Sequence, residues 1–410
     1  MDRRLRISTH AAGGNVRGQV CAEKTQFQSG GNMMREPAFK EFDGYEAVVA
    51  DMETSRKYGR QYEAVGDSVG RQVNLLHPAR MRLMVSDIID ETPSARTFRL
   101  VSRDGYLPPF LAGQYIALFL DLDGIRTSRP YSISSPPNQT GFYEITVRRV
   151  ENGLVSAYLL DEVKRGDALE SSGPAGNFYH NPLFHDRTMA CIAGGSGVTP
   201  FRSMIREIVE CGLDRTVYLF HGSRNLDDLI FHDELRAISD RFENINYMPV
   251  IEEPGEGYEG TTGLITGDLV KETLGDISEK TFYLCGPQGL YDFCEPELKD
   301  LGVPPRKIRK EVYGAPVSIC DYPGWPGEIG KDQVFSVKIA GGPEVEARAG
   351  EPLIVALEKG GVATPSLCRS GECSMCRVKV VSGRVFQPAG VPVRKSDRRF
   401  GYVHSCVSYP

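Results

Sequence analysis

Residues 78–184 repeat a pattern of short apolar runs, each ended by Pro, Gly, Asn or Asp. The runs read MRLMVSDIID, ARTFRLVS, GQYIALFLDL, RPYSISS and FYEITVRRV, followed by one helical pattern, LVSAYLLDEV, and a last strand in GDALESSGPAGNF. Several short strands at this spacing, with turn residues between them, are typical of an antiparallel barrel. The pattern therefore predicts an antiparallel β-barrel domain over residues 78–184.

From residue 185 to 313 the pattern changes to alternating strands and amphipathic helices. Strands are predicted in TMACIAGG, TVYLFHG, INYMPVI, TFYLCG and KIRKEVY, and helices in PFRSMIREIVEC, DDLIFHDELRAISDRF and GLYDFCEPELKDL. Strands separated by helices indicate βαβ units and a parallel sheet. We expect an α/β domain here, with Gly212 ending its first helix as a C-cap.

The two ends of the chain carry weaker patterns. Residues 1–77 combine polar Gly-rich stretches with some helical character, which predicts a partly disordered, partly helical extension; Met33 and Met34 are alternative starts. Residues 314–330 are rich in Gly and Pro and are predicted to be a linker. Residues 331–410 predict a small α+β domain of short strands, one helix and a cysteine-containing loop.

Composition limits the class of protein. Of the 410 residues, 40% are hydrophobic and 25% are charged, as in a soluble globular protein of several domains. No apolar run is as long as a membrane span, and the N-terminus lacks the apolar core of a secretory signal. Ten cysteines are too sparse for a disulfide scaffold. We therefore expect a cytoplasmic protein with free thiols.

Four cysteines in the C-terminal part have a diagnostic spacing. Cys368, Cys373 and Cys376 read C-x4-C-x2-C, and Cys406 follows after 29 residues. This is the spacing of a plant-type [2Fe–2S] site, whereas four-iron ferredoxins and zinc ribbons space their cysteines differently. Gly371, in the loop CRSGECSMC, relieves crowding where backbone amides must point at sulfur. The four thiolates are therefore the predicted ligands of a [2Fe–2S] cluster.

The charge is unevenly distributed along the chain. Residues 331–410 contain 12 Lys and Arg against 7 Asp and Glu, although the whole chain has a net charge of −6. An acidic body with a basic C-terminal part argues against nucleic acid as the main partner. The basic part is either an ordinary solvated surface or a docking face for an acidic redox partner.

A barrel strand contains a motif suited to a cofactor with phosphate groups. Its residues are Arg129, Pro130, Tyr131 and Ser132. A guanidinium can pair with a pyrophosphate, and a tyrosine two residues on lies on the same strand face, where it can cover a flat ring. On its own, this motif is equally consistent with an ordinary strand that binds no cofactor.

The segment from Gly153 through Val155 to Ser156 opens the helix of the barrel domain. The free amides and the positive dipole end of a helix form an anion site. Read alone, the segment is only the start of a helix. Together with Arg129, it would provide a second binding point for a diphosphate.

A glycine-rich turn joins the first strand of the α/β domain to its first helix. It consists of Gly194, Gly195, Ser196, Gly197, Val198, Thr199 and Pro200. A turn at this place in a βαβ unit is where a dinucleotide phosphate binds. It is not a GxGxxG sequence, it lacks the lysine of a P-loop, and a plain strand–helix turn is the alternative.

Cys285, Gly286 and Pro287 follow the apolar run TFYL. Ligands of open α/β sheets sit at the carboxyl ends of the strands, so Cys285 is expected to face the same crevice as Thr199. The alternative is a buried structural thiol.

These four motifs, in this order, resemble the ferredoxin–NADP⁺ reductase superfamily over about residues 80–313. The cysteine loop adds a resemblance to a plant-type ferredoxin domain, which has a β-grasp fold. The order of flavin, NAD and [2Fe–2S] domains is that of phthalate dioxygenase reductases, phenylacetyl-CoA epoxidase reductases and hybrid-cluster-protein reductases.

The resemblance implies roles for individual residues. It makes Arg129 the flavin phosphate ligand, Tyr131 and Ser132 the isoalloxazine contacts, and Thr199 a neighbour of the nicotinamide. Cys285 matches the residue beside the hydride path, and Glu311 the acidic residue near the flavin. The further residues that we expect to bind the flavin or the nicotinamide dinucleotide are Pro130, Val147, Arg149, Gly153, Val155, Ser156, Gly194, Gly195, Ser196, Gly197, Pro200, Gly286 and Pro287.

Local differences within the superfamily indicate which flavin and which nicotinamide are used. FMN-type relatives carry a GRGGS phosphate loop, whereas this chain has GLVS and, at 173–178, GPAGNF, as FAD-type relatives do. FAD is therefore expected. Ser223 and Arg224 suit a 2′-phosphate, but GSR also occurs in relatives that use NADH. The sequence leaves both NADH and NADPH open as the electron donor, and NADH is favoured.

The predicted function is an NAD(P)H-dependent flavin/iron–sulfur oxidoreductase. Electrons pass from NAD(P)H to FAD, to the [2Fe–2S] cluster and then to a protein acceptor, an oxygenase or another redox partner. The alternative is a dedicated reductive activator or electron-donor subunit for a corrinoid or radical enzyme, with residues 1–77 as its docking module.

Overall fold

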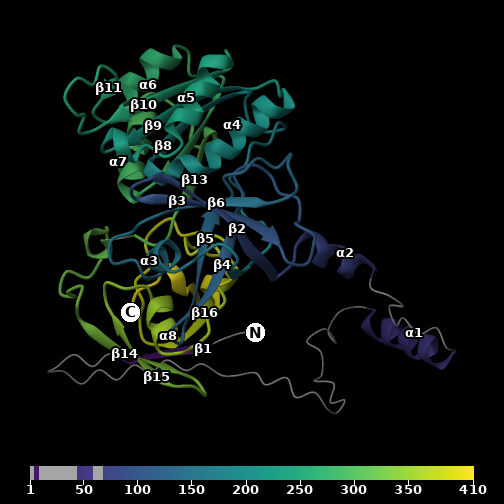
Figure 1. Ribbon diagram of the computed structural model, residues 1–410. Coiled ribbons are helices and arrows are strands. Elements are labelled where there is room, and N and C mark those ends of the chain that lie inside the picture. The colour runs from purple at the N-terminus through teal and green to yellow at the C-terminus, as the bar shows by residue number, and fades with distance from the viewer. Residues whose placement is uncertain (1–3, 9–43, 59–67, 317) are drawn as a thin grey trace.

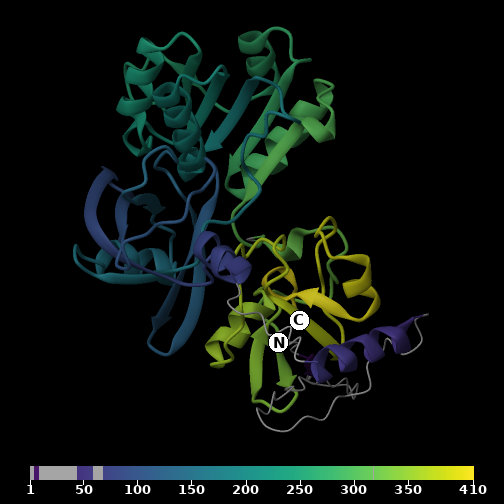
Figure 2. The ribbon, with the colours of Figure 1, turned by 90° about the vertical axis from the view of Figure 1, so that its right-hand side faces the viewer.

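The structure is a computed structural model that describes residues 4–8, 44–58, 68–316 and 318–410. Its strands form three sheets, with the α/β part at the top of Figure 1, the antiparallel sheet in the middle and the C-terminal sheet below; Figure 2 shows them after a quarter turn. In this described part of the chain, no helix is long and apolar enough to cross a membrane.

The middle sheet is antiparallel and has six strands. Their spatial order is β5 (Ile125–Ser132), β4 (Tyr115–Leu122), β7 (Ala168–Ser171), β2 (Met81–Thr92), β3 (Ala95–Ser102) and β6 (Tyr143–Arg148). Alternate residues at the start of β2 are buried, as one-sided strands require, and α3 (Leu154–Asp161) adds Leu159 and Leu160 to the same core. The predicted antiparallel sheet is confirmed.

The upper sheet is parallel throughout. The order is β11 (Thr261–Thr262), β10 (Ile245–Ile251), β9 (Thr216–Ser223), β8 (Thr188–Gly194), β12 (Lys280–Gly286) and β13 (Ile308–Val312). Its helices are α4 (Thr199–Cys211), α5 (His232–Arg241), α6 (Gly267–Leu274) and α7 (Gln288–Asp300), with 3-10 turns at η1 (Gly195–Val198), η2 (Leu226–Asp228) and η3 (Pro305–Lys307). Gly212 has a φ of 62° and caps α4, so the predicted α/β arrangement is confirmed.

The strand order of this sheet reverses at β8. The chain moves outward through β9, β10 and β11, then returns to place β12 on the other side of β8. Open α/β sheets bind ligands at such a point, outside the carboxyl ends of the strands. The last residues of β8 and β12 are Gly194 and Gly286, so two of the predicted motifs lie at this point.

The C-terminal sheet has five strands, and one of them comes from the other end of the chain. The order is β15 (Glu344–Arg348), β14 (Val334–Ile339), β1 (Arg4–Ser8), β16 (Arg377–Ser382) and β17 (Tyr402–His404). The helices α8 (Leu353–Lys359) and α9 (Lys395–Arg399) and the turns η4 (Ile319–Asp321) and η5 (Ser405–Val407) complete this part. Strand β1 pairs antiparallel with β14 and parallel with β16.

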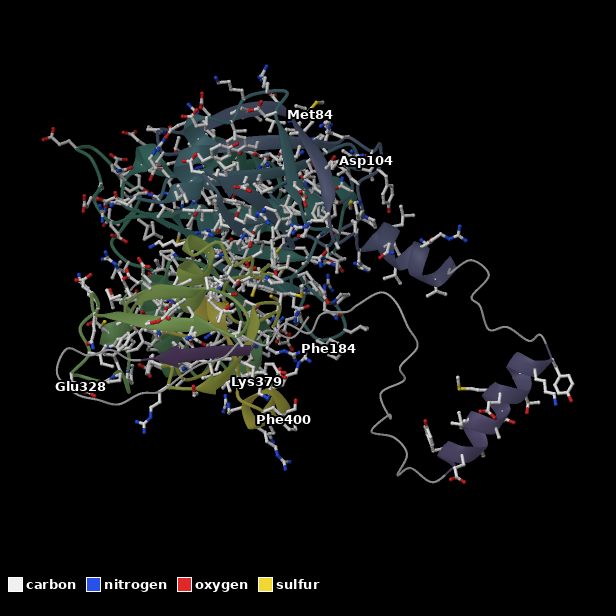
Figure 3. The ribbon with its side chains drawn as sticks, turned by 90° about the horizontal axis from the view of Figure 1, so that it is seen from below. Met84, Asp104, Phe184, Glu328, Lys379 and Phe400 are labelled. Atoms are coloured by element: carbon white, nitrogen blue, oxygen red, sulfur yellow. The ribbon has the colours of Figure 1, made fainter. Side chains whose placement is uncertain are left out.

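The place of β1 differs from the prediction that residues 1–77 form an extension. Without this five-residue strand, β14 and β16 would face each other across a gap one strand wide, so pairing there satisfies backbone groups on both sides. Helices α1 (Tyr45–Lys57) and α2 (Ser68–Leu76) agree with the partly helical expectation, and Figure 3 shows α1 standing apart from the body. The expected disorder and the alternative starts at Met33 and Met34 fall outside the described residues.

Candidate functional site

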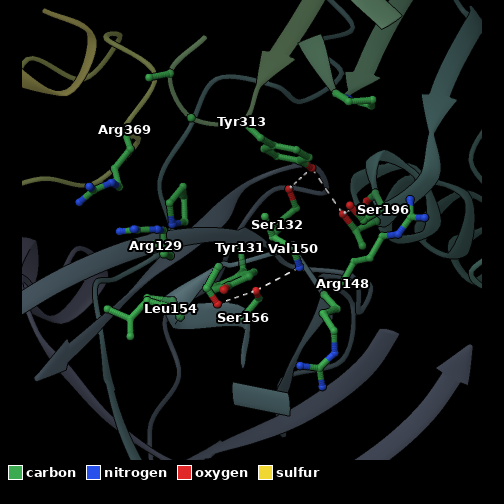
Figure 4. Close-up of a pocket in the computed structure, with 18 of the residues that line it drawn as sticks. Arg129, Tyr131, Ser132, Arg148, Val150, Leu154, Ser156, Ser196, Tyr313 and Arg369 are labelled. Atoms are coloured by element: carbon green, nitrogen blue, oxygen red, sulfur yellow. Dashed lines mark hydrogen bonds between the residues drawn. The ribbon is translucent and has the colours of Figure 1, made fainter. Parts of the chain in front are cut away.

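A cavity of about 690 Å³ lies where the three sheets meet (Figure 4). Its walls come from β5, β6 and α3, from the carboxyl edge of the parallel sheet, and from α8 and the cysteine loop. The lining residues that the sequence had indicated are Arg129, Pro130, Tyr131, Ser132, Arg149, Gly153, Val155, Ser156, Gly194, Ser196, Thr199, Gly286, Pro287 and Cys406. One cavity therefore brings together the flavin, nicotinamide and cluster motifs.

Arg129 lies near the end of β5 and is half-buried. Its Nη1 donates to Thr127 Oγ1 at 2.6 Å and to the carbonyl oxygen of Ser128 at 2.7 Å. Burial and the neighbouring Arg369 lower the pKa of Arg129 to about 10. No carboxylate among the described residues forms an ion pair with this guanidinium. A half-buried cation without such a partner is suited to an anionic ligand.

The N-terminus of α3 opens onto the same cavity. The amides of Leu154, Val155 and Ser156 precede the first intrahelical hydrogen bond, so they are free to bind a ligand. Ser156 Oγ instead braces the turn, because it accepts from the amide of Val150 and donates to the carbonyl of Gly153, both at 3.1 Å. A Cβ at Gly153 would lie 2.7 Å from this oxygen, which explains the glycine.

The glycine-rich turn contacts the end of β12 directly. A Cβ at Gly197 would lie 1.9 Å from the carbonyl oxygen of Cys285, so only glycine permits this approach. Gly195 has a φ of 52° and needs similar freedom. Thr199 Oγ1 donates to the carbonyl of Ser196 at 3.0 Å. These contacts place the third and fourth motifs side by side.

Tyr313, which the sequence analysis did not single out, joins these motifs to β5. Its hydroxyl lies 2.9 Å from Ser132 Oγ and 3.5 Å from Thr199 Oγ1, and accepts from Cys285 Sγ at 3.0 Å. Tyr313 lines the cavity, whereas Cys285 is buried behind it, and burial raises the pKa of that thiol. The sequence offered one indication of Tyr313, because it is an aromatic residue only two positions after the predicted site residue Glu311.

The four cysteines of the C-terminal part lie close together as two pairs. The Sγ atoms of Cys376 and Cys406 are 3.2 Å apart, and the amide of Cys373 donates to Cys368 Sγ at 3.4 Å. No three ligand side chains in the described part of the chain converge on a single ion position. Two thiolate pairs suit a two-iron cluster, which divides its four cysteine ligands between two irons.

The loop that carries these cysteines has an unusual backbone. Arg369, Gly371 and Ser374 have φ values of 54°, 87° and 60°, a region that non-glycine residues rarely adopt. A Cβ at Gly371 would lie 2.9 Å from the Val407 side chain. The loop therefore turns tightly around its thiols, and the donor set fits a [2Fe–2S] cluster.

The remaining predicted residues lie behind the cavity wall or away from it. Apart from the cluster ligands Cys368, Cys373 and Cys376, they are Val147, Gly195, Gly197, Pro200, Ser223, Arg224, Cys285 and Glu311. Val147 belongs to the core of the antiparallel sheet. Glu311 is paired in register with Cys285, and burial, with Glu372 as the next cause, raises the pKa of its carboxyl.

Ser223 and Arg224 lie at the carboxyl end of β9, next to an acidic loop. The amides of Glu252 and Glu253 donate to the carbonyls of Ser223 and Arg224 at 3.0 and 2.7 Å. Arg224 Nε is 3.8 Å from Glu253 Oε1. A second cavity of about 720 Å³ opens here, and its charged lining residues are Asp227, Arg236, Glu253, Glu256 and Glu259.

Two arginines of the first cavity were missed in the sequence. Arg148 pairs with Asp228 of the parallel-sheet part, and Arg369 pairs with Glu358 of α8. Arg148 precedes Arg149 and Arg369 follows Cys368, so adjacency to predicted residues was the only signal.

The fold and the site together define a multidomain oxidoreductase of the flavin, nicotinamide and iron–sulfur class. Family models match the chain at residues 82–180 (oxidoreductase FAD-binding domain), 191–295 (oxidoreductase NAD-binding domain) and 337–410 (2Fe-2S iron-sulfur cluster binding domain). The structure of phthalate dioxygenase reductase superposes with a TM-score of 0.59 at 24% identity, over 80% of this chain and 95% of that one.

The family of this chain is shown by its similarity to curated relatives. The NADH oxidoreductase HCR of Escherichia coli (strain K12) is 32% identical over 332 residues, which cover 80% of this chain and 95% of the relative. A glycine betaine monooxygenase reductase subunit of Pseudomonas aeruginosa is 29% identical over 337 residues, covering 79% and 91%. The chain belongs to the family of NAD(P)H-dependent flavoprotein reductases that carry FAD, NAD and [2Fe–2S] domains. The family resemblance and the cofactors expected from the sequence are confirmed.

Proposed function

We propose that this chain takes electrons from NADH and delivers them, through FAD and a [2Fe–2S] cluster, to a partner protein of the oxygenase class. The observation that supports this most directly is the single cavity lined by the RPYS segment, the α3 N-terminus, the glycine-rich turn and the cluster ligand Cys406. The similarity to glycine betaine monooxygenase reductase subunits favours an oxygenase as the acceptor.

Each wall of the cavity has a separate task. Arg129 and the free amides of α3 bind the diphosphate, and Tyr131 and Ser132 hold the isoalloxazine. When bound, FAD accepts a hydride from the nicotinamide and releases electrons one at a time.

The sheet that carries the flavin motif is proposed to close into a barrel. Its two edge strands are β5 and β6. Ile133, just after β5, forms an isolated bridge with Ile145 of β6. This bridge supports closure of the sheet into a barrel. Closure removes exposed strand edges and gives a rigid binding site for the cofactor.

The nicotinamide is proposed to enter between the glycine-rich turn and the end of β12. Thr199 lines the hydride path, with Cys285 behind Tyr313 and Glu311 paired in register with Cys285, and these three are the catalytic residues that we propose. Gly194, Ser196, Gly286 and Pro287 supply the surface against which the dinucleotide lies.

The electron leaves through the exposed side of the cysteine loop. Cys373 is only partly buried, unlike the other three cysteines, and Met375 beside it is 49% exposed. The partner is therefore expected to dock over this side of the loop.

The domain boundaries follow from these assignments. We propose an FAD domain at 78–184, an NAD domain at 185–313, a linker at 314–330 and a ferredoxin domain at 331–410 that β1 completes. None of the nine cysteines in the described part forms a disulfide, which supports a reducing, cytoplasmic location.

NADH is proposed as the donor because the strand end that receives the adenosine ribose is acidic. Arg224, the candidate 2′-phosphate ligand, already faces Glu253, and three of the other four charged lining residues of that cavity are carboxylates. A 2′-phosphate would meet like charges there, whereas a carboxylate can accept a hydrogen bond from a ribose 2′-hydroxyl.

The wild-type protein is expected to prefer NADH over NADPH by about 50-fold or more in kcat/KM, and Glu253→Lys should raise kcat/KM for NADPH by about 10-fold. The substitution removes one carboxylate from the ribose site and releases Arg224. Steady-state reduction of ferricyanide with each nucleotide measures both ratios.

The matched control is Glu243→Lys, which makes the same charge change at an exposed residue of the same domain. It should leave both ratios as in the wild type. Equal use of NADPH by the wild-type protein would contradict the assignment.

Arg129→Ala is expected to weaken FAD binding by roughly 2–4 kcal/mol, because a diphosphate would lose a charged hydrogen-bond donor. The flavin-to-protein ratio after gel filtration and the dissociation constant from flavin fluorescence measure the effect. Arg126→Ala, at an exposed position of the same strand, is the control and should retain its flavin. Extracted flavin that chromatographs as FMN would contradict the FAD assignment.

A further inference from the structure

Arg369, in the cysteine loop, reaches across to the strand that carries the flavin motif. Its Nη1 lies 3.4 Å from Thr127 Oγ1, the same oxygen that receives a hydrogen bond from Arg129 at 2.6 Å. Both arginines line the first cavity, one from each domain (Figure 4). Two guanidinium groups from different domains therefore converge at one point of the cavity wall.

The orientation of Arg369 is fixed by buried contacts. Its Nη1 and Nη2 donate to the two carboxylate oxygens of Glu358 at 2.6 and 3.1 Å, and Glu358 Oε2 in turn accepts from Thr127 Oγ1 at 3.1 Å. Arg369 and Glu358 are only 7% and 5% exposed. Next to them, Ser128 Oγ lies 2.7 Å from Ser366 Oγ. The domain interface is thus a dense polar contact that holds the guanidinium against the cavity.

Both guanidinium groups keep donors for a ligand. An arginine has five N–H donors, and Arg369 uses three of them in the contacts above. Arg129 uses only Nη1, for Thr127 and Ser128. In the described part of the chain, the remaining donors of the two side chains have no protein partner.

The local charge is also unbalanced. Glu358 lies beside the two guanidinium groups, but its oxygens are taken up by Arg369 and Thr127, and Arg129 forms no ion pair among the described residues. An excess positive charge in a partly buried place is costly unless an anion compensates it. A phosphate group accepts several charged hydrogen bonds and is the chemistry that this pair of arginines suits.

We infer that Arg369 is a second arginine ligand for the phosphate groups of the bound flavin, so that the ferredoxin domain supplies part of the FAD site. This inference rests on the function proposed above and extends its binding site to a residue of the cluster loop. Because the ligand is held from two domains, FAD binding and docking of the ferredoxin domain stabilise each other.

The test compares flavins with and without phosphate on full-length protein stripped of flavin. Dissociation constants for FAD and for riboflavin are measured by fluorescence titration in the wild type, Arg369→Gln and the double variant Arg369→Gln/Glu358→Gln. The double variant replaces the buried ion pair by two amides, so no unpaired carboxylate is left at the interface. Arg384→Gln, at an exposed position of the same domain, is the matched control, and the absorption of the [2Fe–2S] cluster checks that each protein is folded.

The expected result is a rise of about 10- to 100-fold in the dissociation constant for FAD in the double variant, with that for riboflavin within about twofold of the wild type. Unchanged FAD binding would overturn the inference. An equal loss for both flavins would also overturn it, because Arg369 would then support the interface and not the phosphates. Wild-type protein that binds no FAD would instead refute the proposed function itself.

Discussion

Replacing Cys373 by serine is expected to abolish electron delivery to cytochrome c while NADH still reduces the flavin. Cys373 is one of four cluster ligands and lies on the partly exposed side of the loop, so its loss should remove most of the [2Fe–2S] absorption and the reduced-state EPR signal. Cys373 itself does not line the flavin cavity, and the nicotinamide turn belongs to another domain, so reduction of the flavin by NADH is expected to persist.

Stopped-flow reduction of the flavin by NADH, ferricyanide reduction and cytochrome c reduction measure the three steps separately. The first two should stay within about twofold of the wild type and the third should fall at least about 100-fold, because centres that act in series lose only the later steps. Cys211→Ser, at an exposed thiol at the end of α4, is the control. Full cytochrome c activity in Cys373→Ser would contradict the proposed order of transfer, and four irons per wild-type chain would contradict the [2Fe–2S] assignment.

Removing residues 1–8 is expected to destabilise the ferredoxin domain and to lower its cluster content to about a tenth of the wild type or less. Strand β1 lies between β14 and β16. Its loss leaves the pairs β14–β15 and β16–β17, and isolated two-stranded units are marginally stable in water. Iron and sulfide analysis, together with the thermal unfolding of the cluster absorption, measures the effect, while the flavin should stay bound more firmly than the cluster.

A point substitution tests the same strand without shortening the chain. Leu5 is paired with Ile339 and with Val380, and Leu5→Pro should reproduce the loss because proline does not fit a central strand. Met52→Pro, in α1, places proline in the same N-terminal region but outside the three sheets, so it should keep a full cluster. A truncated protein beginning at Met33 that retains one cluster with wild-type thermal stability would contradict the role of β1.

The features that sequence patterns determined are those in which a few neighbouring residues carry the whole signal. The loop from Cys368 to Cys376 is such a case, because its ligand spacing and Gly371 are local, and the matching 2Fe–2S domain confirms it. The alternation of strands and helices predicted the parallel sheet for the same reason. Gly212 ends α4 as expected, since a left-handed cap is a local property of the chain.

The features that only the tertiary structure decided depend on residues far apart in sequence. Nothing in the run RLRIS indicates which strands it pairs with, because any short strand offers the same backbone groups, and its place between β14 and β16 came from the gap in that sheet. The same holds for Tyr313, whose hydroxyl meets Ser132 across the cavity. Arg369 could not be singled out in the sequence, because the contact of its side chain with Thr127 joins residues that are 242 positions apart. Such contacts depend on how the domains pack against one another. Packing between domains, unlike the burial of one face of a helix or strand, produces no periodic pattern in the sequence.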